Sequence, residues 1–369
     1  MPAHSRLLLS GYYGFGNTGD EAILAGALAG FRELAPQVEI VVLSQDPQAT
    51  TAQHGVPAIP RGFRSLKQAL AQCDLFVSGG GGLIQDATSW RSPLYYLQAV
   101  RMALGRRVPV MLMAQSITPL RRHWVRWLAR RVLNRVSLIT VRDAASAREL
   151  SALGVARPQV VVTADLSLLL SSPPVSASSA AQRVIVCPRR WPGASESACH
   201  ALVHELAGGL SQVAAEVVLL PMQPRDLAVT RAVAAAMSRP AQVVEPARSF
   251  EELLALIGSA QVAVGMRLHA LIFAARLGAV PLGISYDPKV CAFLETIGEL
   301  PIATPEQVRA GALAERIARA FAEHAEKRAQ LLAVMEQPRE AARENIRLAV
   351  ELVKKQEENL LPSKQRGFG

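Results

Sequence analysis

The chain has 369 residues, of which 50% are hydrophobic and 19% are charged, a composition that excludes a disordered protein and suffices for two domains. Its formal net charge of +10 favours anionic partners. Nucleic acid has little support, because only 5% of residues are aromatic and no nucleic-acid-binding motif occurs. The N-terminal residues lack the layout of a signal peptide, and no apolar run approaches the roughly 18 residues that cross a bilayer. The four scattered cysteines lack metal-ligand spacing, so we expect a cytoplasmic protein without a bound metal.

Short apolar strands alternate with helices along the first part of the chain. The hydrophobic pattern predicts strands over 7–10, 39–43, 75–77, 110–114 and 138–141. It predicts helices over 22–34, 66–72, 94–104 and 120–134. Such alternation is typical of a parallel sheet with helices on both faces.

A segment rich in serine and proline interrupts this alternation, which restarts at 184–187 and continues to 284. We therefore predict an α/β protein with two Rossmann-like domains, 1–170 and 183–304, that face a cleft and are joined by a linker over 171–182. Charged helices are expected over 305–361 and a disordered tail over 362–369.

The most informative junction between a strand and a helix lies in the second domain. A strand over 261–264 and a helix over 268–277 place Arg267 and His269 where ligands bind in open α/β sheets. Backbone N–H groups at Leu268 and the fork of Arg267 would attract an anion, and a histidine can transfer a proton near neutral pH. Alternatively, Arg267 pairs with a carboxylate and His269 caps the turn.

The strand predicted over 280–284 leads to Tyr286, Asp287 and Lys289. Because the carboxyl ends of parallel strands share one sheet edge, these residues could face the same crevice as Arg267.

A glycine-rich loop follows the first strand, and Gly14 to Gly19 nominally match a dinucleotide-binding fingerprint. Gly11 to Tyr13 lengthen this loop, however, and the carboxylates of Asp20 and Glu21 would repel a pyrophosphate. We expect instead that Asn17 and Asp20 bind a hydroxyl-rich group and that Asp20 accepts a proton. The two acids could equally cap the following helix.

Four successive glycines follow the strand over 75–77. Their amides, including those of Gly80 and Gly81, suit an anion or a ligand that lies on the backbone, although a flexible turn would look the same. Gln85 and Asp86 are predicted at the start of the next helix.

The helix over 121–135 is basic. Arg122, Arg126 and Arg130 form one stripe, and Trp124, Leu128 and Val132 form another. This pattern suits peripheral contact with an anionic membrane at its inner face. It also suits an ordinary helix that covers a sheet and exposes its arginines.

Taken together, these segments resemble the polysaccharide pyruvyl transferase family, in particular its CsaB type. The resemblance rests on Gly11 to Leu24, Ser78 to Asp86, Val141 to Asp143, Pro221 to Gln223, Arg267 to His269, and Tyr286 to Val290. It implies a fold like that of GT-B glycosyltransferases. It also implies transfer of the pyruvyl group of phosphoenolpyruvate to two sugar hydroxyls as a cyclic ketal, with release of phosphate.

In CsaB-type members the implied acceptor is N-acetylmannosamine in a lipid-linked precursor of a secondary cell-wall polymer, and the ketal anchors S-layer proteins. Phosphoenolpyruvate would be a substrate, so no cofactor is expected.

The chemistry implied by this resemblance assigns roles to the candidate residues. Arg267, Lys289 and Arg142 would bind the donor's carboxylate and phosphate, together with the amide at Leu268. His269 would protonate the donor and Asp20 would assist the attacking hydroxyl.

The strand over 184–187 is followed by Arg189, Arg190 and Trp191. These residues could add to either substrate site or form a surface loop.

Two other functions remain open. A nucleotide-sugar glycosyltransferase of the same architecture would usually hold the ribose with an acidic residue in the second domain. A non-catalytic binder of anionic lipid or wall polymer would use the basic helix.

Overall fold

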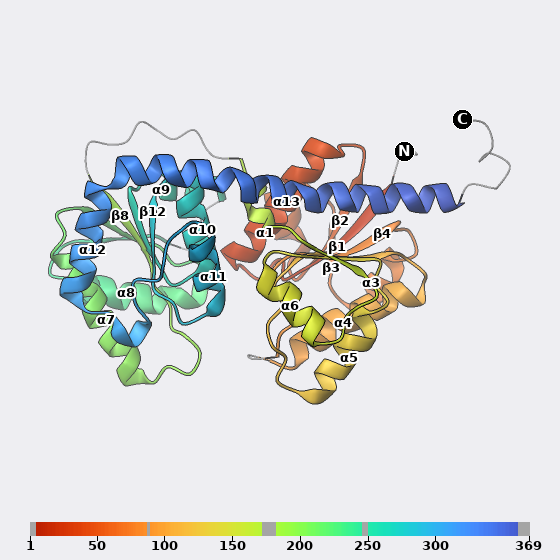
Figure 1. Cartoon of the computed structure of the whole chain (residues 1–369), viewed down its shortest axis with the longest axis horizontal. Helices are drawn as coiled ribbons and strands as arrows, with labels where there is room; N and C mark the ends of the chain where they lie inside the picture. The colour runs from red at the N-terminus through yellow and green to blue at the C-terminus, as the bar shows by residue number, and fades with distance from the viewer. Residues whose placement is uncertain (1–4, 87–88, 172–181, 246–249, 361–369) are drawn as a thin grey trace. The chain divides into compact units, whose positions relative to one another are not determined.

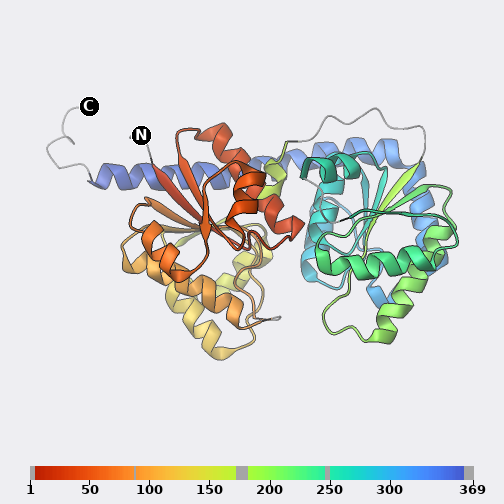
Figure 2. The same ribbon diagram turned by 180° about the vertical axis from the view of Figure 1, so that it is seen from behind.

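The computed structural model describes residues 5–86, 89–171, 182–245 and 250–360, which form two compact units (Figures 1 and 2). The first unit comprises 1–16, 20–170 and 338–369, and the second comprises 17–19 and 171–337. Most of the predicted linker and all of the predicted tail lie outside the described residues. Within those residues no helix has both the length and the apolar character that a membrane span requires.

The first unit is built on a seven-stranded parallel sheet in the order β3-β2-β1-β4-β5-β6-β7. The central strands are buried on both faces, because α1 covers one face while α4 and α5 cover the other (Figure 1). The strands are β1 (Arg6–Ser10), β2 (Glu39–Ser44), β3 (Ala58–Pro60), β4 (Leu75–Ser78), β5 (Val110–Gln115), β6 (Leu138–Val141) and β7 (Gln159–Val162). The helices are α1 (Thr18–Leu34), α2 (Pro47–His54), α3 (Phe63–Ala69), α4 (Arg91–Gly105), α5 (His123–Leu133) and α6 (Ala144–Ala152).

All the strands predicted for this unit occur, but β3, β7, α2 and α6 were missed. The prediction that Gln85 and Asp86 start a helix is wrong, because α4 begins only at Arg91. The buried carboxylate of Asp86 instead accepts hydrogen bonds from the backbone N–H groups of Arg121 and Arg122, both at 2.8 Å. Asp86 therefore fixes the chain that enters α5.

The second unit has a five-stranded parallel sheet in the order β10-β9-β8-β11-β12. Its strands are β8 (Arg183–Cys187), β9 (Glu216–Leu219), β10 (Gln242–Val243), β11 (Val262–Gly265) and β12 (Val280–Gly283). Its connecting helices are α7 (Glu196–Ser211), α8 (Leu227–Ala236), α9 (Phe250–Gly258), α10 (Leu268–Leu277) and α11 (Pro288–Thr296). Helix α10 has the bounds that the sequence predicted.

Charged helices follow Pro305, as expected. Helix α12 (Ala310–Ala322) packs on α7 within the second unit. Helix α13 (His324–Leu360) contains Pro338, the residue at which the chain returns to the first unit. The last 23 residues of α13 thus complete the N-terminal fold.

Asn345 of α13 is fully buried and joins α13 to the carboxyl ends of β6 and β7. Its Oδ1 accepts hydrogen bonds from the hydroxyls of Thr140, at 2.5 Å, and Thr163, at 2.9 Å. Its Nδ2 donates to the carbonyl oxygens of Ala164, at 3.2 Å, and Ala342, at 3.0 Å. The side chain's hydrogen-bonding capacity is therefore used in full.

Replacing Asn345 by leucine should lower the free energy of unfolding by about 3 kcal/mol, because it leaves buried hydroxyl and carbonyl groups without partners. Urea denaturation followed by circular dichroism measures this change. Arg347→Ala, on the exposed side of the same helix, is the control and should change stability by less than about 0.5 kcal/mol. Equal losses in the two variants would contradict the role given to Asn345.

Candidate functional site

Each sheet contains one point at which the order of the strands reverses. In the first unit the chain builds β2 and β3 on one side of β1 and then continues with β4 on the other side. In the second unit it builds β9 and β10 on one side of β8 and then continues with β11 on the other. Ligands bind at the carboxyl ends of the strands that flank such a point. The candidate sites are therefore the loops after β1 and β4, and those after β8 and β11.

Arg267, two residues after the end of β11, is held by a carboxylate that the sequence analysis did not single out. Its Nε and Nη2 donate to Asp226 Oδ2 and Oδ1 at 3.0 Å and 2.6 Å. The Asp226 side chain is 2% exposed and that of Arg267 is 14% exposed, so this bidentate pair is largely shielded from water. The pairing that the sequence left open for Arg267 therefore occurs.

Gln223 is a third member of this cluster. With its amide oriented to suit its neighbours, its oxygen accepts hydrogen bonds from Arg225 Nε at 3.0 Å and from Arg267 Nη2. The guanidinium plane of Arg267 is thus fixed from two sides.

Arg189, which follows β8, brings a second guanidinium to this edge of the sheet. It lies 5.1 Å from the ring centroid of Tyr286, the residue that follows β12 by a short turn. Burial lowers the pKa of Arg189, and repulsion from Arg267 lowers it further. Burial raises the pKa of Tyr286, an effect that the charge of Arg189 opposes. Two cations that repel each other while partly buried favour an anionic ligand.

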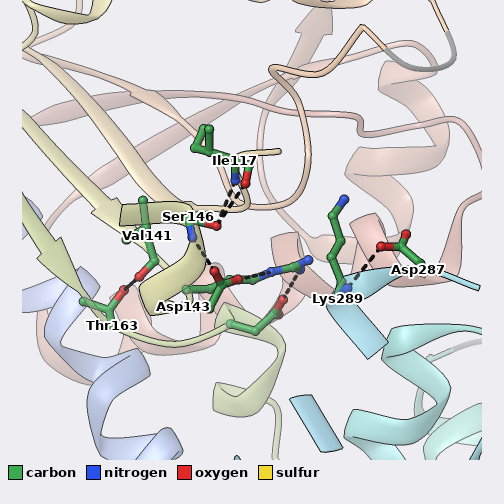
Figure 3. Close-up of polar contacts among 9 residues, drawn as sticks. Ile117, Val141, Asp143, Ser146, Thr163, Asp287 and Lys289 are labelled. Atoms are coloured by element: carbon green, nitrogen blue, oxygen red, sulfur yellow. Dashed lines mark hydrogen bonds and ion pairs between the residues drawn. The ribbon is translucent and has the colours of Figure 1, made fainter. Parts of the chain in front are cut away.

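The two neighbouring helices begin at the same edge. Arg267 is the N-cap of α10, which places His269 in the first turn, next to Leu268. Asp287 is the N-cap of α11, and its carboxylate accepts from the backbone N–H of Lys289 at 3.1 Å (Figure 3). Both helix starts therefore present positive dipole ends beside Arg267 and Tyr286.

In the first unit, a backbone N–H group of the loop after β1 donates to the carboxylate of Glu21 in α1. Glu21 Oε1 accepts from the backbone N–H of Gly14 at 2.6 Å, and Oε2 lies 3.6 Å from His54 Nε2. The backbone N–H of Gly14, which a dinucleotide-binding loop would offer to a pyrophosphate, therefore already donates a hydrogen bond to Glu21. Asp20 instead lies beside Gly81, where an added Cβ would be 3.1 Å from Asp20 Oδ1. Asn17 Oδ1 accepts from the backbone N–H of Gly19 at 3.2 Å.

The start of the four-glycine loop is held by hydrogen bonds from the side chain of Gln115 in β5. Gln115 Nε2 donates to the carbonyl oxygens of Ser78, at 3.2 Å, and of Gly79. The Tyr13 hydroxyl occupies the place where Gly79 would carry a Cβ, only 2.2 Å away, so no larger residue fits there. Burial, and next the charge of Asp20, raise the pKa of this hydroxyl, which keeps it protonated. A Cβ added at Gly80 would lie 2.9 Å from a methyl group of Ile23, so this position is also tightly packed.

The sequence analysis did not identify a cluster of aromatic side chains in and near the loop after β1. Tyr12 and Phe15 stack with ring centroids 4.0 Å apart. The guanidinium of Arg61 lies 4.9 Å from the Phe15 ring and 4.0 Å from the Tyr95 ring. Arg61 follows β3, a strand that the sequence did not reveal, so its place at this edge could not be inferred.

Two further candidate residues, the predicted donor ligand Arg142 and the acceptor or loop candidate Arg190, form ion pairs within the chain. Arg142 belongs to the first unit, where it pairs with Asp165 at 2.9 Å and with Asp143 at 3.8 Å. Asp143 also caps α6 through Ser146, as Figure 3 shows. Arg190 points to an exposed partner, Glu196, at 3.1 Å, whereas its neighbour Arg189 joins the cationic cluster.

Comparisons with known proteins agree with this architecture. A family model described as "Polysaccharide pyruvyl transferase" matches residues 17–288. No curated protein sequence matches the chain significantly.

Solved structures are similar in fold only. S. aureus MnaA with UDP has 12% identity and a TM-score of 0.67, over 99% of this chain and 100% of that one. UDP-GlcNAc 2-epimerase from Neisseria meningitidis bound to UDP-GlcNAc has 12% identity and a TM-score of 0.63, over 95% and 100%. Spinosyn rhamnosyltransferase SpnG complexed with spinosyn aglycone has 12% identity and a TM-score of 0.58, over 94% and 100%. The chain therefore has a GT-B-like α/β fold with C-terminal helices.

Removing the carboxylate in Asp226→Ala should cost about 3–5 kcal/mol of stability, because it leaves the guanidinium of Arg267 partly buried and unpaired. Thermal or urea unfolding of the full chain measures the change. Glu245→Ala removes an exposed carboxylate from Arg231, in a pair whose side chains are 60% and 62% exposed. This control should cost less than about 1 kcal/mol. A small effect of Asp226→Ala would show that Arg267 does not depend on the ion pair.

Proposed function

Because the chain belongs to the polysaccharide pyruvyl transferase family, we propose that it moves the pyruvyl group of phosphoenolpyruvate onto two hydroxyls of a sugar and releases phosphate. The observation that carries this proposal is the pair of partly buried guanidinium groups, Arg189 and Arg267, after the strands that flank the reversal in the second sheet. A donor that carries both a carboxylate and a phosphate needs such a concentration of positive charge.

The donor would bind mainly in the second unit. Asp226 holds Arg267 in one orientation, so little conformational entropy is lost when the guanidinium binds an anion. Arg189, Lys289 and the backbone N–H groups at the Leu268 helix start would complete the set. Arg142 is proposed as a further ligand, although its two carboxylate partners already offset its charge.

In the proposed reaction His269 gives its proton to the methylene carbon of phosphoenolpyruvate, which becomes a methyl group and leaves C2 electrophilic. A first sugar hydroxyl attacks C2 and loses its proton to Asp20. The bond from C2 to the phosphate oxygen then breaks, and the second hydroxyl attacks C2 to close the ketal. Asp20 passes the first hydroxyl's proton to the departing phosphate, and the second hydroxyl's proton restores the protonated His269, so the step needs no oxidant or reductant.

The acceptor would bind in the first unit. Asp20 lies beside Gly81 of the four-glycine loop, and Gly80 and Gly81 are proposed to line the acceptor site through their backbone. Asn17 and Gln85 are proposed as hydrogen-bonding partners, and the stacked rings of Tyr12 and Phe15 as an apolar surface for the sugar ring.

We propose N-acetylmannosamine of a lipid-linked precursor of a secondary cell-wall polymer as this acceptor, which the enzyme would modify at the inner face of the membrane; the product ketal would later anchor S-layer proteins. The resemblance to CsaB-type motifs supports this acceptor.

A nucleotide-sugar transferase is the second candidate, because structures that contain UDP share the fold. Such an enzyme would usually offer an acidic side chain to the ribose. Asp226 lies in the loop after β9, directly before α8, but both of its oxygens accept hydrogen bonds from Arg267. This pairing favours the pyruvyl transferase.

The test of the proposed function is phosphate release from phosphoenolpyruvate, with and without an N-acetylmannosaminyl acceptor. We expect acceptor-dependent release that falls 10²- to 10⁴-fold in His269→Gln, on the order expected when a general acid is lost. The control is the wild-type protein with UDP-sugars in place of phosphoenolpyruvate. Turnover of a UDP-sugar without release from phosphoenolpyruvate would overturn the proposal in favour of a glycosyltransferase.

The two adjacent arginines after β8 provide a matched pair of variants. Arg189→Ala should raise the KM for phosphoenolpyruvate about 10- to 100-fold, because a charge-assisted hydrogen bond is worth about 1.5–3 kcal/mol. Arg190→Ala, which loses only an exposed ion pair, should change KM less than about two-fold. Steady-state kinetics of phosphate release compare them. The reverse order of effects would exclude Arg189 from the donor site.

A further inference from the structure

The positive charge of this chain is concentrated in one segment of the first unit. Residues 87–142 contain eleven arginines and no aspartate, glutamate or lysine. The chain as a whole carries a formal charge of +10, so everything outside this segment is close to neutral. The segment includes α4, β5, α5 and β6, and the two helices lie side by side in both views (Figures 1 and 2).

Helix α5 buries one face and exposes another that is unusually rich in tryptophan. Val125, Ala129, Val132 and Leu133 face the sheet. Trp124 and Trp127 are 45% and 59% exposed. The sequence aligned Trp124 with Leu128 and Val132, but the buried arc runs through Val125 and Ala129 instead. The helix does cover the sheet, yet its exposed face is not simply an arginine face.

A third exposed tryptophan comes from the start of α4. Trp90 is 43% exposed, and its ring meets that of Trp124 edge to face, with centroids 6.1 Å apart. Arginines cover these rings: Arg91 lies 5.6 Å from the Trp90 centroid, and Arg131 lies 4.9 Å from the Trp127 centroid. Three of the chain's four tryptophans therefore gather on one basic surface, which we call the Trp–Arg surface.

We propose that the Trp–Arg surface, formed by Trp90, Arg91, Arg121, Trp124, Trp127 and Arg131, binds the headgroup region of an anionic lipid bilayer. Exposed indole rings are unfavourable in water but settle at a membrane interface, where their apolar body and polar N–H both find partners. Arginines beside them attract anionic lipids at the same depth.

Nucleic acid would use the same arginines, but phosphate contacts would not explain three indole rings on the same surface. Charge and ring exposure together favour the lipid. This inference concerns a surface of the first unit and does not rest on the proposed function.

Sedimentation with vesicles of phosphatidylcholine and phosphatidylglycerol in a 4:1 ratio tests the proposal on the full chain. We expect binding that is lost with phosphatidylcholine alone and weakened by salt. The triple variant Arg91→Gln, Arg121→Gln, Arg131→Gln should lower the partition coefficient about 100-fold, which is about five-fold for each arginine. The double variant Trp124→Ala, Trp127→Ala should lower it about ten-fold or more.

The matched control is Arg231→Gln, Arg316→Gln, Arg319→Gln, which removes the same charge from exposed positions of the second unit. It should retain nearly all of the binding, and circular dichroism of every variant verifies folding. Equal loss in the two triple variants would overturn the proposal, because it would show attraction by net charge alone. Vesicle binding that is the same in the double tryptophan variant as in the wild type would also overturn the proposal. So would displacement of the protein from vesicles by duplex DNA, if the double variant binds the vesicles as tightly as the wild type does.

Discussion

The reversal of strand order beside β1 and again beside β8 is the constraint on which the candidate sites depend. A parallel sheet needs crossover helices, and at a reversal the two loops leave toward opposite faces, so neither fills the space above the sheet edge. Both glycine-rich loops of this chain flank the first reversal, and Arg189 and Arg267 flank the second. Residues separated by tens of positions are thereby brought to one edge within each unit.

At the second reversal, the ion pair between Asp226 and Arg267 combines a structural and a functional requirement. A buried carboxylate is unfavourable without a partner, and a bidentate guanidinium compensates it while keeping one orientation. Asp226 offsets part of the charge of Arg267, and the partly buried guanidinium of Arg189 adds a second positive charge beside this pair. A site with two unpaired arginines would be harder to keep folded, and one with none would not attract a doubly charged anion.

The sequence revealed the parts of the site that depend on local order. Helix α10 starts at Leu268 as predicted, because the change from a buried strand to helical periodicity occurs within a few residues of Gly265. Partners that are distant along the chain stayed hidden: Asp226 lies 41 residues from Arg267, and no local pattern joins them. Arg61 was missed because β3 is only three residues long. The stripe of Trp124, Leu128 and Val132 did not show which face of α5 is buried, because periodicity alone does not distinguish it from the neighbouring stripe of Val125, Ala129 and Val132 that packs in the core.

The first unit is also discontinuous along the chain, and this affects how the protein is made. Asn345 supplies the hydrogen bonds that Thr140 and Thr163 need, about 200 positions after the strands that carry them. Domains generally fold in order during synthesis, but this one cannot be completed until α13 has left the ribosome. During that interval the carboxyl ends of β6 and β7 lack their cover, and the second unit has the chance to fold first. The N-terminal unit would then be the later of the two to reach its native state.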